Sequence, residues 1–165
     1  MNEWEQHELF EIEVLDILKS NRVLEGLIFG GGTMLRLCHD LPRRLKIEIR
    51  REWKNWEYEE KIAFSRFRTT QVLLKGHTLM QTLRNKLEAL ADRGAIRDAF
   101  DIEFILRLNI PLPPLAAEKK ECLLRQIRRF TPRDFKVALS SVLEKERRDY
   151  YVKNGFQYLN QKLSL

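Results

Sequence analysis

The amino-terminal part of the chain alternates between helical and strand-like patterns of apolar side chains. Residues 3–19 carry apolar residues such as Phe10, Val14 and Ile17 at helical spacing with acids between them, which predicts an amphipathic helix. Residues 24–29 form a short apolar run that stops at three glycines, which predicts a buried strand.

A second helix is expected to follow the glycines. Thr33 opens it, and Met34 and Leu37 belong to its apolar side. Leu41 and Pro42 close it, because the residue before a proline avoids the helical region.

Strict alternation of apolar and polar residues over 45–50 is the clearest strand pattern in the chain, and it places Glu48 on the polar face. Residues 51–60 are polar apart from two tryptophans and predict a loop or turn. Further strands are predicted over 62–67 and 72–74.

The pattern becomes helical from Thr78 onward. Thr78 and Gln81 fit a capping box at the start of a helix that runs to about Arg93. A second helix is predicted over 96–108 and a basic amphipathic one over 115–130, with a proline-rich break between them. The last helix starts at Thr131 and reaches Arg148 or beyond.

These patterns predict an α+β fold in two parts. Residues 1–76 form a small α/β part with a mixed sheet, and residues 77–165 form a helical bundle packed on it. With 165 residues, the two parts can also form one compact domain.

Composition narrows the class of protein. The chain is 44% hydrophobic and 33% charged with a mean hydropathy of −0.42, which is typical of a soluble globular protein. No apolar run approaches the ~18 residues of a membrane span, and the acidic start lacks the pattern of a signal peptide. We therefore expect a cytoplasmic protein without membrane contact. Cys38 and Cys122 lie far apart and predict neither a zinc site nor a disulfide framework.

A net charge of +6 favours an anionic partner such as a nucleotide or RNA. The excess is modest, and many basic proteins bind no polyanion.

The turn at Gly31, Gly32 and Thr33 has the chemistry of a phosphate site. Glycines between a strand and a helix let backbone amides approach an anion, and the helix amino terminus adds partial positive charge. The alternative is a tight turn without a ligand.

Two motifs in order resemble the abortive-infection AbiEii/AbiGii nucleotidyltransferase toxins. The first comprises residues 29–37 (FGGGTMLRL), followed by the sequence HDLPR at residues 39–43. The second is LRNKLEAL at residues 83–90, followed by Arg93 and by RDAFDI at residues 97–102. The resemblance covers roughly residues 20–110.

The resemblance implies a nucleotidyltransferase of a bacterial toxin–antitoxin or phage-defence system. Such an enzyme uses Mg²⁺ and a nucleoside triphosphate (NTP) to modify tRNA, another RNA or a protein, beside a cognate antitoxin. Gly31, Gly32 and Thr33 would hold the triphosphate, and Glu48 would ligate the metal.

The second motif implies further site residues on two consecutive helices. Lys86 and Asp101 would be catalytic, with Arg93 and Asp98 at the nucleotide. Asp98 and Asp101 share one helix face, as do Lys86 and Arg93. A salt-bridge network between the two helices is the alternative for these residues, and a solvent-facing strand position paired with a neighbouring cation is the alternative for Glu48.

The chain departs from the family in one segment. The family follows its LPR motif with an aspartate pair, D-x-D, that ligates the metal, but here Arg43 runs directly into Arg44 and Leu45. Three explanations compete: a catalytically dead relative, a segment missing from this sequence, or an active site completed by another chain.

An inactive relative is therefore the alternative function, binding RNA, a nucleotide or an antitoxin. Its binding surface would be the basic carboxy-terminal helices, which are otherwise an ordinary solvated surface. The basic residues concerned are Lys119, Lys120, Arg125, Arg128, Arg129, Arg133 and Lys136.

Overall fold

The structure is a computed structural model, and it describes residues 3–41, 54–139 and 143–165. The predicted strand over 45–50, with Glu48, lies outside the described residues.

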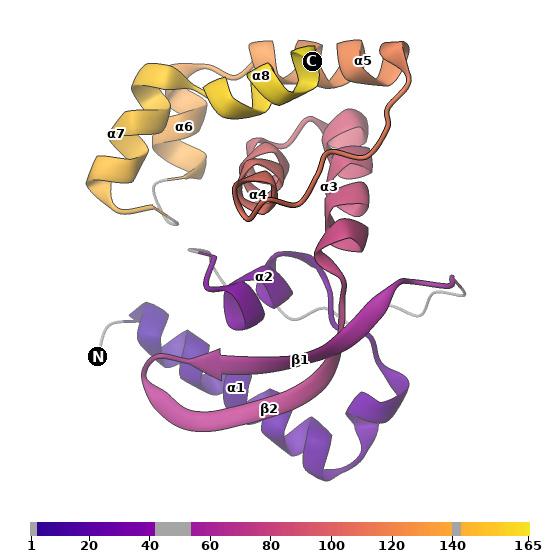
Figure 1. Ribbon diagram of the computed structural model, residues 1–165. Helices are drawn as coiled ribbons and strands as arrows, with labels where there is room; N and C mark the ends of the chain where they lie inside the picture. Colours follow the sequence, from indigo (N-terminus) through magenta and orange to yellow (C-terminus); the bar gives the residue numbers. More distant parts are fainter. Residues whose placement is uncertain (1–2, 42–53, 140–142) are drawn as a thin grey trace. The chain divides into compact units, whose positions relative to one another are not determined.

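Helices and a β-hairpin make up the α+β fold that the sequence predicts (Figure 1). In chain order the elements are α1 (Glu3–Ser20), the 3₁₀ helix η1 (Val23–Gly26), α2 (Gly31–His39), β1 (Tyr58–Ser65), β2 (Arg68–His77), α3 (Leu79–Arg93), α4 (Ile96–Arg107), α5 (Ala117–Arg128), α6 (Pro132–Ala138), α7 (Lys145–Asn154) and α8 (Gln157–Ser164). They divide into two compact units, Met1–Gln81 and Thr82–Leu165. This boundary lies within the first turn of α3, slightly beyond the position predicted from the sequence.

The core of the first unit is the inner face of the hairpin covered by α1 and α2. Ala63, Val72 and Leu74 alternate with exposed residues along the two antiparallel strands, as the two-residue period of a strand requires. They form one cluster with Ile12 and Leu15 of α1 and with Leu37 of α2.

The strand predicted over 24–29 is wrong for most of its length. Arg22 adopts a left-handed conformation (φ 61°) and turns the chain into η1, so only Phe29 pairs with the sheet, through a parallel bridge to Gly76. The start of α2 at Gly31 leaves room for no longer strand. The hairpin strands are also longer than predicted: β1 takes in residues 58–60, which the sequence assigned to a loop.

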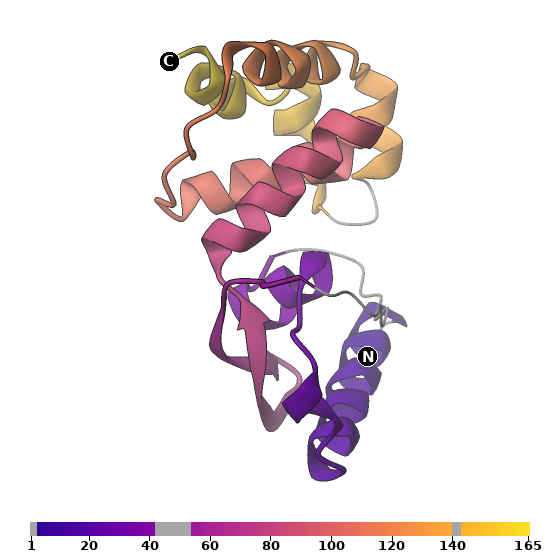
Figure 2. The same cartoon turned by 90° about the vertical axis from the view of Figure 1, so that its right-hand side faces the viewer.

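The regular elements in the described part of the second unit are all helices, and the helical period places the core of this unit. Leu83, Leu87 and Leu90 recur along α3 and are buried, as are Ile102 and Ile105 of α4. The proline-rich segment predicted as a break connects α4 to α5 (Figure 2).

The helix start at Thr131 is confirmed in detail. Its side chain accepts from the Asp134 amide while the Asp134 carboxylate accepts from the Thr131 amide, a complete capping box. The single long helix predicted beyond it is wrong, because α6 ends at Ala138. Another interruption falls at Gly155, whose φ of 57° ends α7 before α8 begins.

None of the helices in the described part of the chain is long and apolar enough to cross a membrane.

Ion pairs link α1 and α2 of the first unit. Arg36 pairs with Glu8 of α1 and with Asp40, and Asp40 also pairs with Arg66 at the hairpin turn. Glu11 lies one turn from Glu8 on the same buried face of α1. Within the described residues, neither Glu8 Oε1 nor Glu11 Oε2 has a hydrogen-bond partner. Burial, and then the charge of Glu8, raises the pKa of Glu11 to about 7.

Replacing Glu11 with Gln is expected to stabilise the first unit at alkaline pH. Glu11 keeps its proton in the folded state up to about pH 7 but loses it near pH 4.5 in the unfolded state. The contribution of protonated Glu11 to folding stability is therefore fully present below pH 4.5 and is lost as the pH rises through 7. We expect Glu11→Gln to gain about 1–2 kcal/mol at about pH 8, after allowing for solvent screening, and little at about pH 5. Urea unfolding followed by tryptophan fluorescence measures this, because all three tryptophans lie in residues 1–81. The exposed Asp16→Asn is the control, and a gain of equal size at both pH values would contradict the assignment.

Candidate functional site

A buried cluster of charges joins α3 to α4 in the second unit. The Lys86 ammonium group lies 2.6 Å from Asp101 Oδ2 and 3.0 Å from Asp98 Oδ1. Both aspartates are fully buried, and Lys86 is only 7% exposed. The three-residue spacing places both aspartates on one face of α4, as the sequence predicts, and in the structure this face is turned toward α3.

Arg93, at the end of α3, completes the cluster from its exposed side. It donates from Nε to Asp98 Oδ2 (2.7 Å) and from Nη2 to Asp98 Oδ1 (2.8 Å), a bidentate pair that fixes the guanidinium plane. Burial alone raises the pKa of Asp98, but the hydrogen bond from Arg93 and the charge of Lys86 outweigh it, so this pKa lies below its ordinary value. The cluster therefore holds two carboxylates against two cations and is electrically balanced.

Burying such a cluster costs desolvation free energy, and removing one of its members costs more. Removing one partner of a buried ion pair leaves the other charge unsolvated, whereas apolar replacement of the whole group is often harmless. The sequence leaves two interpretations of these residues, a salt-bridge network and a nucleotide site. The observed distances are those of a salt-bridge network. Arg93 lies at the exposed edge of this network, where a ligand can still reach it.

The glycine turn is built on the single bridge of Phe29 to β2. Phe29 donates to Lys75 O (2.7 Å) and accepts from the His77 amide (2.8 Å), and the chain then enters α2. A Cβ atom at Gly30 would lie 2.6 Å from His77 Nδ1, so only glycine fits there.

The amino terminus of α2 begins at Gly31, two residues before the predicted start. Gly31 has φ +74° and open space beside its Cα, and the N-cap residue Gly30 has no side chain with which to cap this helix end. Thr33 is buried at 6% exposure, so the exposed group at this end is the Gly31 backbone. Backbone amides at an uncapped helix start suit an anion.

The predicted site residues thus form two groups, one on each unit. Lys86, Arg93, Asp98 and Asp101 form the charge cluster, while Gly31, Gly32 and Thr33 open α2. Glu48 lies outside the described residues.

The described acids do not gather into a cluster of metal-ligating side chains. No group of three or more His, Cys, Asp or Glu side chains is placed to hold a metal within residues 3–41, 54–139 and 143–165. Asp98 and Asp101 are each paired with a cation, which removes the negative charge that a divalent ion requires.

Sequence reasoning missed a third buried acid on α4. Glu103 is fully buried, accepts from the Tyr151 hydroxyl (3.1 Å) and the Leu159 amide (3.1 Å), and pairs with Arg107 (3.0 Å). The only sequence signal was an acid among the apolar residues of a helix, which does not distinguish a buried acid from a solvated one.

Comparisons with known proteins found no matching family model, no matching curated protein and no matching solved structure.

Replacing Lys86 with Met is expected to lower the free energy of unfolding by about 3–5 kcal/mol, because buried Asp101 loses the Lys86 ammonium group and buried Asp98 keeps only the partly exposed Arg93. Adding Asp98→Asn and Asp101→Asn to Lys86→Met should restore most of this loss. The control is Lys119→Met, which breaks the exposed Lys119–Glu88 pair and should cost less than about 1 kcal/mol. Urea unfolding followed by circular dichroism provides the values. A triple variant no more stable than Lys86→Met would contradict the ion-pair account.

Proposed function

We propose that this protein is a nucleotidyltransferase-like protein of a bacterial toxin–antitoxin or phage-defence system. It binds an NTP with Mg²⁺ and transfers a nucleotide to RNA or protein, with a cognate antitoxin as its protein partner. The observation that carries the proposal is the contact of Lys86 with Asp101, the two residues that the family resemblance singles out as catalytic.

The glycine turn supports the same proposal from the first unit. It combines an uncapped helix start, a residue at positive φ and open space next to its backbone. These features let a phosphate group approach the amides of α2 without meeting a side chain.

Binding and transfer are separable parts of this proposal. The described part of the chain has no group of three or more metal-ligating side chains, and the sequence lacks the D-x-D segment of the family. Nucleotide binding at the glycine turn therefore does not depend on those acids, whereas transfer depends on ligands such as Glu48, which the resemblance assigns.

Gly31→Asp is expected to weaken binding of each NTP with Mg²⁺ by about tenfold or more, because it places a carboxylate beside the phosphate. Gly31→Asn is the matched control, since Asn has the same shape and equally tolerates positive φ but carries no charge. Calorimetric titration measures both. Equal affinities of the two variants, or no binding of any NTP at roughly 10 mM, would contradict the phosphate site.

Glu48→Gln, titrated with and without Mg²⁺, distinguishes the contribution of the metal to NTP binding from that of the phosphate contacts. If Glu48 ligates Mg²⁺, its replacement weakens binding only when Mg²⁺ is present. An equal effect with and without the metal would remove Glu48 from the proposed site.

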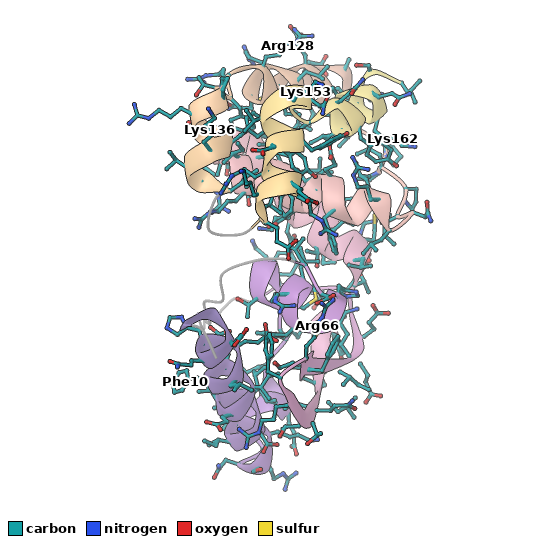
Figure 3. All side chains as sticks on the ribbon, turned by 90° about the vertical axis from the view of Figure 1, so that its left-hand side faces the viewer. Phe10, Arg66, Arg128, Lys136, Lys153 and Lys162 are labelled. Atoms are coloured by element: carbon teal, nitrogen blue, oxygen red, sulfur yellow. The ribbon has the colours of Figure 1, made fainter. Side chains whose placement is uncertain are left out.

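A second candidate function, an inactive relative that binds RNA, is favoured by the distribution of charge. Residues 82–165 contain 17 Lys and Arg against 11 Asp and Glu, whereas residues 1–81 contain 13 of each. The second unit therefore carries the whole net charge of +6. Arg128 and Lys136 extend outward from α5 and α6 (Figure 3).

RNA binding by this unit should weaken steeply with salt. If about three or four phosphates are contacted, raising the salt from about 50 to about 200 mM should lower affinity more than tenfold by counterion release. Fluorescence anisotropy of a labelled single-stranded RNA measures the slope. The double variant Arg128→Gln with Arg133→Gln should flatten it, while Lys19→Gln with Arg22→Gln in the neutral first unit should not. Binding that does not respond to salt would contradict this candidate.

A further inference from the structure

A cavity of about 370 Å³ opens in the second unit between the α3–α4 turn and the α5–α6 turn. Its charged lining consists of two arginines, Arg93 and Arg129, and two aspartates, Asp92 and Asp134. Phe130 supplies an aromatic surface, and Gln126 lies beside Gly94 at the end of α3. The elements that form it all belong to the second unit.

The α3–α4 side of the cavity is held in place by backbone constraints. Gly94 has φ +58°, and a Cβ atom there would lie 2.7 Å from Gln126 Oε1, so the turn packs directly on the α5 side chain. Gln126 also donates to Ala91 O at 3.3 Å, which holds its amide against the end of α3. The wall is therefore formed before any ligand arrives.

Arg93 links this cavity to the buried charge cluster. Its Nε and Nη2 are engaged by Asp98, which Lys86 fixes in turn, and 62% of the side chain remains exposed. The pair with Asp98 leaves Nη1 on the outer side of a guanidinium plane that cannot rotate without breaking two hydrogen bonds. A pre-oriented guanidinium group binds phosphate with little loss of entropy.

The lining suits a ligand that combines an anion with hydrogen-bond donors. Two guanidinium groups attract a phosphate, but an isolated phosphate would also face the carboxylates of Asp92 and Asp134. Asp134 already accepts from Thr131 through Oδ2, so its other oxygen is the one suited to a ligand. Ribose hydroxyls and base amines are donors that such oxygens accept.

We propose that this cavity binds a nucleoside 5′-monophosphate without a metal ion. Its phosphate lies at Arg93 and Arg129, its donors face Asp92 and Asp134, and its base packs on Phe130, whose ring stands edge-on to Phe135 and Phe156. The cavity volume lies at the lower end of the range of small-molecule sites, which fits a mononucleotide. The site is independent of the glycine turn, since it lies in the other unit and needs no Mg²⁺.

Calorimetric titration of the full chain with AMP, CMP, GMP and UMP in the presence of EDTA tests this site. At least one nucleotide should bind, and Arg129→Gln should weaken it about tenfold. Arg147→Gln is the matched control: it removes the same charge from an exposed position of α7 that does not line the cavity, and should leave affinity within about twofold. Inorganic phosphate should bind about tenfold more weakly than the best nucleotide.

Three results would overturn the proposal. They are no binding of any monophosphate at roughly 10 mM, equal losses in Arg147→Gln and Arg129→Gln, and inorganic phosphate binding as tightly as the nucleotides. These titrations contain no Mg²⁺, and both variants lie in the second unit. A negative result here therefore leaves the Gly31 test unaffected, and a negative result at Gly31 leaves this test unaffected.

Discussion

The second unit is organised by the need to satisfy three buried carboxylates on one helix. Asp98 and Asp101 turn toward α3 and meet Lys86, while Glu103 lies two residues further on and turns toward α7 and α8. A buried carboxylate without a partner costs several kcal/mol, so the helices that supply the partners are held in one arrangement. Tyr151 and the Leu159 amide fix α7 and α8, and Lys86 fixes α3. The apolar residues of α4 contribute burial energy on every side, but the acids specify which helix packs on which face.

The first unit satisfies its charges less completely. Arg36 pairs with Glu8 and Arg66 pairs with Asp40, yet Glu11 is buried beside Glu8 with a carboxylate oxygen that has no hydrogen-bond partner among the described residues. The pKa of Glu11 is raised as a consequence, because burial disfavours the charged carboxylate and protonation removes its charge. The stability of this unit near neutral pH therefore depends on a proton, whereas that of the second unit depends on ion pairs.

Charge and geometry together explain why nucleotides and RNA are the partners proposed for this protein. The net charge of +6 belongs to the second unit, and the buried cluster there is balanced, so the excess lies on helix surfaces. Arg93 belongs both to the buried cluster and to the cavity: it neutralises Asp98 in the cluster and lines the cavity with its exposed side. An ion-pair network and a ligand site are thus compatible at this position, because a guanidinium group has more donors than one carboxylate accepts.

Local pattern was enough to predict α1, the positions of the hairpin strands, the helices from α3 to α5 and the capping box at Thr131, since these depend on periodicity and on contacts within a few residues. It also predicted that Asp98 and Asp101 share one helix face, and that Lys86 and Arg93 share another. Which of these acids meets which cation was decided by tertiary packing, because sequence spacing does not say which face of α4 is turned toward α3.

Two further features could not be predicted from the sequence for the same reason. Two partners of Glu103 lie about 50 residues away, and the walls of the cavity at Arg129 come from two separate turns. Tertiary packing also explains why the apolar run over 24–29 did not become a strand. A strand needs a partner edge, and the early start of α2 leaves Phe29 as the one residue of this run that pairs with β2.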